Sequence, residues 1–541
     1  MSITRGPALS SNADGVGRGV TAGEIRAALE RVLQHSEFQA SERLRQFLRF
    51  VVEESLAGRA EVIKGSRIAR KVFDRGEDFD GTRDPVVRVE AARLRRRLEH
   101  YYFVAGEDDP LRIDIPKGGY VPRFIRQDGD ISQGTSSTPA EAPPRGGASP
   151  TIAIVPFQDL TDDPESTFFG AGLVAELSNE VNRYENVVAV PCPLEEDRGR
   201  ADRALGGARF VLEGSVRRDE TELKLVVQLT DTLAVRQLWG ESYKIPLEAS
   251  RLIAVQEELA RDLMAAVADE YGVISRRLVH ESRDKPPAEL SSYEALLRYH
   301  YYMLVMTLEA GEDALRALQG TTAREPDYGP AWAALANLHV HAFLFDRPGL
   351  EDPLGTALEY AKRGAAQAPE SQLARTILAY LHLLTHQREL FREEVEVALA
   401  LNPSSPTYAG TIGYLFAIAG EYGRAEALLS QTFESGLRQP TWFHHGLFVV
   451  HFARGEYEKA CLEAQRCFPP VGFWDAALRA AALGKLGRVE EAGQALEEVR
   501  RLKPDFEERT EELLYNTPLP AEVRVELLDG LRQAGLRQPP G

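Results

Sequence analysis

Positive charge is concentrated in one short run of this sequence. The run RVEAARLRRRLEHYY at 88–102 places four arginines within residues 93–97, in a chain whose formal net charge is −18. An arginine guanidinium can donate two hydrogen bonds to the edge of a guanine, and it also pairs with phosphate oxygens. The run therefore indicates chemistry with a polyanion, although a merely solvated helix face is the simpler explanation of such a run.

The apolar residues of the run show which side of the expected helix is free for this chemistry. At about 100° per residue, one narrow sector holds Val87, Ala91, Leu94 and Leu98, which are expected to pack inward. A helix that enters the major groove needs arginines beside small apolar side chains, because the latter contact thymine methyl groups. Both kinds occur away from the inward sector, with Val89, Ala92, Arg93, Arg96 and His100 on the opposite face and Arg88, Arg95 and Arg97 on its flanks.

The surrounding sequence predicts the elements that would hold this helix. Helices are expected near 22–34, 41–57, 62–73 and 84–102, followed by the strands LRIDIP and YVPRF, which KGG joins. Residues 1–126 carry 23 Lys and Arg against 19 Asp and Glu, whereas the remainder carries 41 against 63. Only the N-terminal segment therefore suits an anionic partner.

This order of elements resembles the OmpR/ToxR-type winged-helix domain over about 41–125. RLRRRL at 93–98 fits that family's R-L-R-x-K/R-L recognition helix, and KGGY at 117–120 fits its G-x-G-Y wing. The chain lacks the usual N-terminal sheet, and KGG replaces a spaced glycine pair, which leaves the docking geometry open. Duplex DNA is the partner that follows, with Arg88, Arg93, Arg95, Arg96, Arg97 and Lys117 as the predicted DNA-binding residues.

The C-terminal half repeats itself. GEYGRA at 420–425 recurs as GEYEKA at 455–460 and as GRVEEA at 487–492. A period of roughly 34 residues is typical of tetratricopeptide repeats, which stack pairs of helices into a solenoid. We expect about six irregular helix pairs over 290–510, within an all-α domain at 290–541.

Aromatic and polar residues gather in the expected first helices of two repeats, TYAGTIGYLF and TWFHHGLFVV. First helices line the concave face of such a solenoid, so this face is predicted to accept a helix or an extended peptide of a partner protein. The alternative, that these side chains only pack between repeats, stays open. The predicted partner-binding residues are Tyr408, Tyr414, Trp442, His444 and His445.

Between these parts, 151–272 is predicted to be a mixed α/β domain. ELKLVVQLT alternates apolar and polar residues like a half-buried strand, and FVLEGSVRR precedes it as its hairpin partner. TIAIVPFQDLTDDPESTFFGAGLVAELSNEV and the stretch from ARFVLEGSV to WGESY resemble the TolB-like, FlgO-like domain that is fused to tetratricopeptide arrays in many bacterial proteins. Such fusions are often labelled adenylate cyclases, but this sequence shows no further domain with paired metal-binding aspartates.

The sequence offers no recognisable catalytic site. It lacks a G-x-x-x-x-G-K-[S/T] loop, a G-x-S-x-G elbow and an H-E-x-x-H helix. His339 and His341 diverge on a helix, as do the adjacent His444 and His445. The spacing of the three cysteines matches no zinc or redox pattern, so they are expected to be small buried hydrophobes. TDDPE is expected to cap the following helix. We therefore predict no enzyme, no cofactor and no metal site.

Composition and segment boundaries complete the prediction. With 43% hydrophobic residues and no apolar run near 20 residues, the chain is expected to be globular, cytoplasmic and without contact with a membrane. The fold class is multidomain α+β: disordered 1–20, a winged helix-turn-helix at 21–126, a linker at 127–150, the TolB-like α/β domain at 151–272 and the solenoid. The favoured hypothesis is a bacterial transcriptional regulator; a protein-interaction scaffold that does not bind DNA is the alternative. A dimer stays open.

Overall fold

The structure is a computed structural model that describes residues 4–5, 21–35, 38, 41–73, 76, 86–104, 106, 109–116, 119–126, 149–161, 163–191, 207–219, 222–246, 252–347, 349, 351–467 and 472–537. The chain divides into two compact units. One unit is residues 10–143, and the other joins residues 1–9 to residues 144–541. Among the described residues, no helix is both long enough and apolar enough to cross a membrane.

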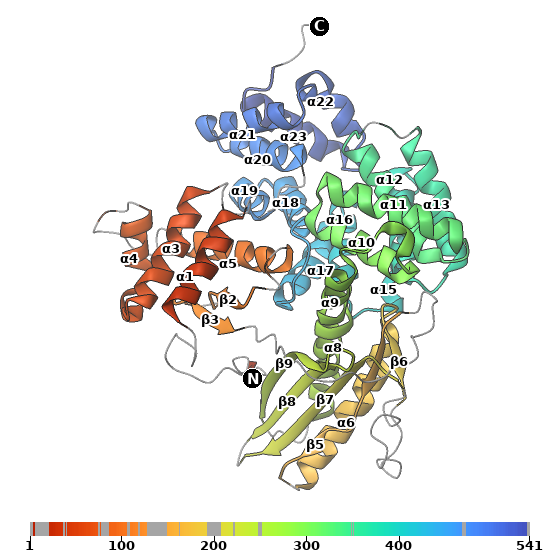
Figure 1. The fold of residues 1–541 in the computed structure, drawn as a ribbon. Coiled ribbons are helices and arrows are strands. Elements are labelled where there is room, and N and C mark those ends of the chain that lie inside the picture. Colours follow the sequence, from red (N-terminus) through yellow and green to blue (C-terminus); the bar gives the residue numbers. More distant parts are fainter. Residues whose placement is uncertain are drawn as a thin grey trace. The chain divides into compact units, whose positions relative to one another are not determined.

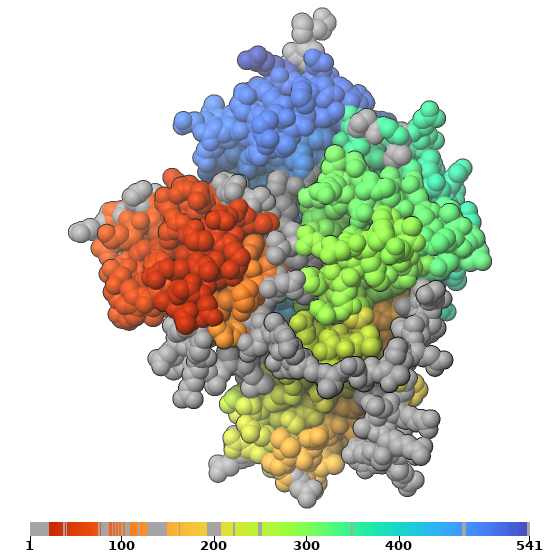
Figure 2. Space-filling model, viewed as in Figure 1, coloured from red at the N-terminus to blue at the C-terminus, as the bar shows by residue number. Residues whose placement is uncertain are grey.

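The smaller unit has helices that are followed by a two-stranded hairpin, as the sequence predicts (Figure 1). In the space-filling view of Figure 2 the described residues of this unit are coloured red to orange. Thr21 caps the first helix, and its hydroxyl and main chain exchange hydrogen bonds with Glu24. A single core joins the inner faces of the four α-helices that the structure describes in this unit to the hairpin. The elements are α1 (Ala22–Gln34), α3 (Glu42–Leu56), a 3-10 turn (Ala60–Val62), α4 (Gly65–Val72), α5 (Val86–Val104), β2 (Leu111–Asp114) and β3 (Arg123–Arg126).

The larger unit begins with a mixed sheet in the order β1-β9-β8-β7-β4-β6, with β5 beside β7 (Figure 1). β4 runs parallel to β6 and β7, whereas β7, β8, β9 and β1 are antiparallel neighbours. The strands are β1 (Thr4–Arg5), β4 (Thr151–Ile154), β5 (Gln158–Asp159), β6 (Val188–Val190), β7 (Phe210–Arg218), β8 (Glu222–Asp231) and β9 (Arg236–Pro246).

The alternation predicted for β8 is confirmed. Leu223, Leu225, Val227 and Leu229 are fully buried, and the residues between them are only partly buried. The buried side chains share one core with the helices α6 (Pro164–Glu180), which follows β5 in the chain, and α8 (Leu252–Ala268), which follows β9. A 3-10 turn (Val181–Arg183) ends α6. The acidic turn caps α6 as expected, because the Asp163 carboxylate accepts hydrogen bonds from the first main-chain amides of that helix.

The expected disorder of residues 1–20 does not hold at Thr4–Arg5, which pair with β9. The remainder of 1–20 lies outside the described residues, as does the predicted linker up to residue 148. The sequence gives Thr4–Arg5 no strand signal of its own, because their pairing depends on a sheet edge formed by residues 243–244.

Helices fill the rest of the larger unit. α9 (Val273–Ser282) and a 3-10 turn (Pro287–Glu289) connect the sheet domain to six described helix pairs, and two further helices follow. The pairs are α10 (Ser292–Val305) with α11 (Leu308–Arg324), α12 (Gly329–Leu344) with α13 (Pro353–Gln367), α14 (Gln372–Leu384) with α15 (Arg388–Leu401), α16 (Pro406–Ala419) with α17 (Tyr422–Glu434), α18 (Phe443–Ala453) with α19 (Tyr457–Arg466) and α20 (Phe473–Lys485) with α21 (Val489–Leu502). The last helices are α22 (Phe506–Tyr515) and α23 (Ala521–Gln533).

The repeated glycine and alanine have separate physical roles. Gly420, Gly455 and Gly487 have φ of 86°, 73° and 68°, in the left-handed region where glycine bears no steric penalty. Each glycine turns the chain from the first helix of a pair to the second. The alanine five residues later is fully buried in each repeat (Ala425, Ala460, Ala492), where the small side chain allows close helix packing.

Candidate functional site

The inward face of the arginine helix α5 is as predicted. Val87, Ala91, Leu94 and Leu98 are at most 3% exposed and belong to the core of the smaller unit. Tyr102, one turn beyond Leu98, accepts a hydrogen bond at its Oη from the main-chain amide of Ile113 (2.8 Å). The helix is therefore fixed to strand β2 by both apolar packing and a polar contact.

The predicted DNA-binding residues differ in their accessibility. Arg88 is exposed at the start of α5, whereas Arg93 is half-buried and pairs with Glu90 one turn away (Nη1 to Oε1, 2.6 Å). The side chain of Arg96 and all of Lys117 lie outside the described residues. Among the predicted DNA-binding residues whose side chains the structure describes, Arg88 is therefore the exposed one.

Two of the predicted residues, Arg95 and Arg97, are not on the open flanks where the helical wheel places them. Arg95 donates from Nε to the carbonyl of Ile115 (2.9 Å) and from Nη2 to that of Gly119 (2.6 Å), so it joins α5 to the turn between β2 and β3. Arg97 is only 9% exposed. The wheel misplaces Arg95 because it contains no information about the hairpin turn, which accepts both hydrogen bonds of Arg95.

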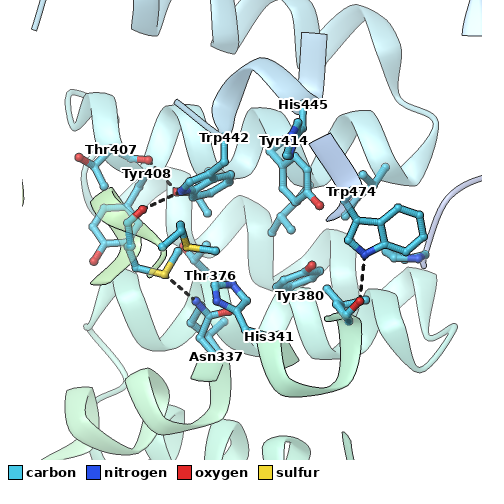
Figure 3. A pocket seen from close by; sticks show the side chains of 18 of the residues that line it. Asn337, His341, Thr376, Tyr380, Thr407, Tyr408, Tyr414, Trp442, His445 and Trp474 are labelled. Atoms are coloured by element: carbon cyan, nitrogen blue, oxygen red, sulfur yellow. Dashed lines mark hydrogen bonds between the residues drawn. The ribbon is translucent and has the colours of Figure 1, made fainter. Parts of the chain in front are cut away.

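The array encloses a cavity of about 140 Å³ (Figure 3). Every first helix of the six pairs contributes to its wall, together with Tyr271 after α8 and residues 517–519 before α23. One lining residue from each helix is Tyr299, Asn337, Thr376, Thr411, Val449 and Leu478. The concave face is therefore a confined cavity of small volume.

Two tryptophans close the array around this cavity. Trp442 donates from Nε1 to the carbonyl of Met303 near the end of α10 (3.1 Å), and Trp474 donates to that of Leu344 at the end of α12 (3.0 Å) (Figure 3). Carbonyl groups at a helix end lack partners within the helix, so both indoles supply a missing donor. Later repeats are thereby joined to the first two across the cavity.

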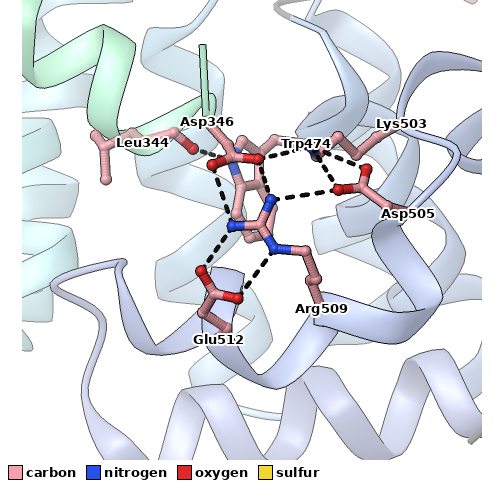
Figure 4. A network of polar contacts seen from close by, with 7 residues as sticks. All are labelled: Leu344, Asp346, Trp474, Lys503, Asp505, Arg509 and Glu512. Carbon is pink, nitrogen blue, oxygen red and sulfur yellow. Dashed lines mark hydrogen bonds and ion pairs between the residues drawn. The ribbon is translucent and has the colours of Figure 1, made fainter. Parts of the chain in front are cut away.

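An ion network reinforces the same closure (Figure 4). Asp346, just after α12, accepts from Lys503 Nζ (2.6 Å) and from Arg509 Nη2 (3.1 Å). Asp505 accepts hydrogen bonds from both Lys503 and Arg509. The Glu512 carboxylate accepts a hydrogen bond from Arg509 Nε (3.0 Å). Several charges form this network, which is more favourable than an isolated surface pair.

Four of the five predicted partner-binding residues meet at the cavity. Tyr408, Tyr414, Trp442 and His445 line it, and the rings of Tyr414 and Trp442 pack edge to face at 5.3 Å. His444 is not among the lining residues. Its ring stacks on Phe433 (4.3 Å), and its Nδ1 shares a hydrogen bond with Glu463 Oε2 (2.7 Å). Adjacent residues point about 100° apart on a helix, so only one of the two histidines can face the cavity.

The cavity wall is aromatic and, among the described residues, contains no Asp, Glu, Lys or Arg. Burial lowers the pKa of His300 to about 3. Burial, together with Arg347, lowers the pKa of His341 to about 3 as well. Both imidazoles are therefore neutral near pH 7. His445 also lines the cavity but differs from them: burial lowers its pKa, yet Cys467 and Asp475 outweigh this effect and raise the pKa well above the usual histidine value.

Two carboxylates join the sheet domain to the array. Asp269, after α8, is buried and accepts from Ser405 Oγ (2.9 Å) and from both the amide and the hydroxyl of Thr407 at the start of α16. Glu185 is exposed and accepts from the amide of Leu373 at the start of α14 (3.3 Å). Burial raises the pKa of the Asp269 carboxyl group, and its hydrogen bonds partly offset the rise. The sheet domain therefore caps two inner helices of the array.

Comparisons with known proteins give one partial sequence match. No protein-family model matches the chain. A protein of Rhizobium meliloti (strain 1021) named "Putative adenylate cyclase 3" is 29% identical over 214 residues, which are 38% of this chain and 35% of that protein. The chain thus spans about a third of the length of this curated relative.

Several solved structures match part of the chain. TolB from Acinetobacter baumannii is 20% identical, covers 21% of this chain and 27% of its own, and has a TM-score of 0.16. The PelC dodecamer from Paraburkholderia phytofirmans is 19% identical over 24% of this chain and 91% of its own, with a TM-score of 0.18. The APC/C hetero-tetramer Cut9–Hcn1 is 13% identical over 53% of this chain and 62% of its own, with a TM-score of 0.33.

Proposed function

We propose that this chain is a DNA-binding transcriptional regulator whose helical array recognises an effector. The smaller unit would bind duplex DNA as a winged helix, with α5 in the major groove and the β2–β3 hairpin as the wing. The observation that carries the proposal is the clamp by Arg95, which holds the hairpin turn against α5 through the carbonyls of Ile115 and Gly119. A helix and a hairpin fixed in this way can contact adjacent parts of one duplex.

The charges of the smaller unit support this proposal. Arg88 on α5 and Arg123 on β3 are exposed, and Arg70 and Lys71 are exposed at the end of α4. These residues can contact phosphates, while Arg96 on the predicted groove-facing side is assigned to a base. Phosphate contacts position a protein on DNA, and base contacts specify the sequence. The alternative is a scaffold whose basic unit contacts an acidic protein.

Fluorescence anisotropy of the full chain with labelled duplexes tests DNA binding. Binding should weaken steeply as salt rises, and Arg88→Ala should reduce the slope of log affinity against log salt by about 1. Arg49→Ala is the matched control, because Arg49 is also exposed but lies on α3, where it pairs with Glu30. Arg96→Ala should lower the preference for the best duplex by about 1–3 kcal/mol. No binding at low salt, or no effect of Arg88→Ala, would favour the scaffold.

The size of the cavity indicates which class of effector it can take. A cavity of about 140 Å³ is close in size to an engineered apolar cavity of about 150 Å³ that binds benzene. We therefore propose that the cavity takes a small aromatic molecule or one aromatic side chain of a protein partner, rather than a whole helix or extended peptide. The supporting observation is the aromatic wall that includes Tyr408, Tyr414 and Trp442.

A thermal-shift screen of small aromatic compounds against the full chain tests the effector site. A compound that binds in the cavity should raise the unfolding temperature of the wild type. The same compound should leave the unfolding temperature of the Thr411→Phe variant unchanged. Thr411 lines the cavity and is only partly buried, so the larger ring would fill the space. A shift that persists in Thr411→Phe would place the compound elsewhere.

A further inference from the structure

Three side chains that the sequence does not group together meet beside the cavity. His445 lies in the first turn of α18, Cys467 directly follows α19, and Asp475 lies in the first turn of α20. One potential donor atom of each lies within 4.8 Å of those of the other two. The 22 and 8 positions that separate these residues give no local signal, because three different elements bring them together.

The cluster is buried, and one of its oxygens lacks a partner among the described residues. Asp475 and Cys467 are 7% and 6% exposed, and the His445 side chain is 13% exposed. Asp475 Oδ1 shares a hydrogen bond with His445 Nε2 (2.6 Å), but Asp475 Oδ2 is buried and no described residue hydrogen-bonds to it. Buried carboxylate oxygens are rarely left in this state, because desolvation is then uncompensated.

We propose that His445, Cys467 and Asp475 form a binding site for a Zn²⁺ ion. Thiolate, imidazole and carboxylate are the three kinds of side-chain ligand that Zn²⁺ accepts, at about 2.3, 2.0–2.1 and 2.0–2.2 Å. Tetrahedral coordination at these lengths separates the donor atoms by roughly 3.3–3.6 Å. The donor atoms already lie within 4.8 Å of each other, so rotations of the side chains suffice to reach that geometry.

The charges also balance. A thiolate and a carboxylate together neutralise the ion, which makes the burial of all three partners less costly. On binding, the thiol of Cys467 and the imidazolium of His445 each lose one proton to solvent, so that Cys467 binds as thiolate and His445 as neutral imidazole. The simpler alternative is an ion pair between His445 and Asp475 alone. It would leave Asp475 Oδ2 unsatisfied and would use Cys467 only as a side-chain partner of His445, with its Sγ 3.7 Å from the carbonyl oxygen of Glu463.

The proposed zinc site lies next to the cavity and shares one residue with its wall. His445 lines the cavity, whereas Cys467 and Asp475 are not among its lining residues. Three protein ligands leave one tetrahedral position for water or for a donor atom of a bound molecule. The site requires neither DNA binding nor a partner protein, so its test is independent of the proposed function.

Titration of the metal-free full chain with Co²⁺, followed by Zn²⁺, tests the proposal. One equivalent of Co²⁺ should produce a sulfur-to-metal charge-transfer band, and one equivalent of Zn²⁺ should remove it. Cys467→Ser should abolish the band. Cys461→Ser is the matched control, because Cys461 is also buried and lies in the same helix–turn segment, yet it is outside the cluster. His444→Gln should likewise retain the band, whereas His445→Gln should lose it.

X-ray absorption of the Zn²⁺-loaded wild type keeps the test decisive if a variant fails to fold. The expected shell has one sulfur at about 2.3 Å and nitrogen or oxygen atoms at about 2.0 Å. A shell without sulfur, the absence of stoichiometric binding, or an undiminished band in Cys467→Ser would each overturn the proposal.

Discussion

The indole of Trp442 donates a hydrogen bond to the main-chain carbonyl of Met303, which lies 139 positions earlier in the sequence, at 3.1 Å. This contact joins the fifth helix pair to the first across the cavity. In an open solenoid each repeat contacts only its neighbours, so stability is approximately a sum of local terms. The contacts of Trp442, Trp474 and Asp346 join repeats that are far apart in the sequence, so they contribute to stability in a way that an open solenoid lacks.

Trp442→Phe should destabilise the array while it retains an aromatic ring beside Tyr414. The loss of a net hydrogen bond and the unsatisfied carbonyl of Met303 should together cost about 1–2 kcal/mol. Urea unfolding followed by circular dichroism measures the change. Tyr515→Phe is the control, because Tyr515 is 69% exposed and should leave the transition unchanged. A transition of Trp442→Phe equal to that of the wild type would mean that the hydrogen bond does not hold the array closed.

Sequence periodicity predicts the elements here better than it predicts the contacts between them. The alternation in β8, the glycines at 420, 455 and 487 and the inward face of α5 each depend on residues close in sequence, and the structure has all three. The partners of Arg95 lie 20 and 24 positions away, and those of the two closing tryptophans more than 100 away. No helical wheel contains such partners, so the wheel places Arg95 on an open flank.

Arg95→Ala should impair DNA binding by a different route from Arg88→Ala. Without its guanidinium, the hairpin turn loses two hydrogen bonds to α5, so its amides should exchange faster with deuterium. Arg88 is exposed, and its substitution should leave exchange in the hairpin unchanged. Hydrogen exchange with mass spectrometry on the full chain separates the two effects. Equal protection of 111–126 in wild type and Arg95→Ala would show that the clamp is dispensable.

The full chain should form no cyclic AMP from ATP and magnesium. The sequence has no recognisable phosphate-cradling loop, and the acidic turn that could suggest a metal site instead caps α6 through Asp163. Incubation followed by chromatography of the nucleotides is the measurement, with heat-treated protein as the control. Cyclic AMP above that control would give the chain a catalytic activity that its described residues do not suggest.

Acidification should destabilise the array through its buried histidines. Burial, with Arg347, holds the pKa of His341 at about 3 in the folded chain, against an ordinary value of 6.5. Between these values only the unfolded chain binds the proton, so the free energy of unfolding falls as pH falls through this window. From pH 7 to pH 5 the loss should be about 2 kcal/mol for His341.

His341→Gln isolates this contribution. Buried carboxylates such as Asp269, whose pKa is raised, act in the opposite direction, but the variant and the wild type share them. Urea unfolding at pH 8 gives the cost of the lost hydrogen bond to Tyr302, and the same comparison at pH 5 should show a deficit smaller by about 2 kcal/mol, because the variant has no imidazole to protonate. A deficit that is equal at both pH values would mean that His341 titrates alike in the folded and unfolded chains.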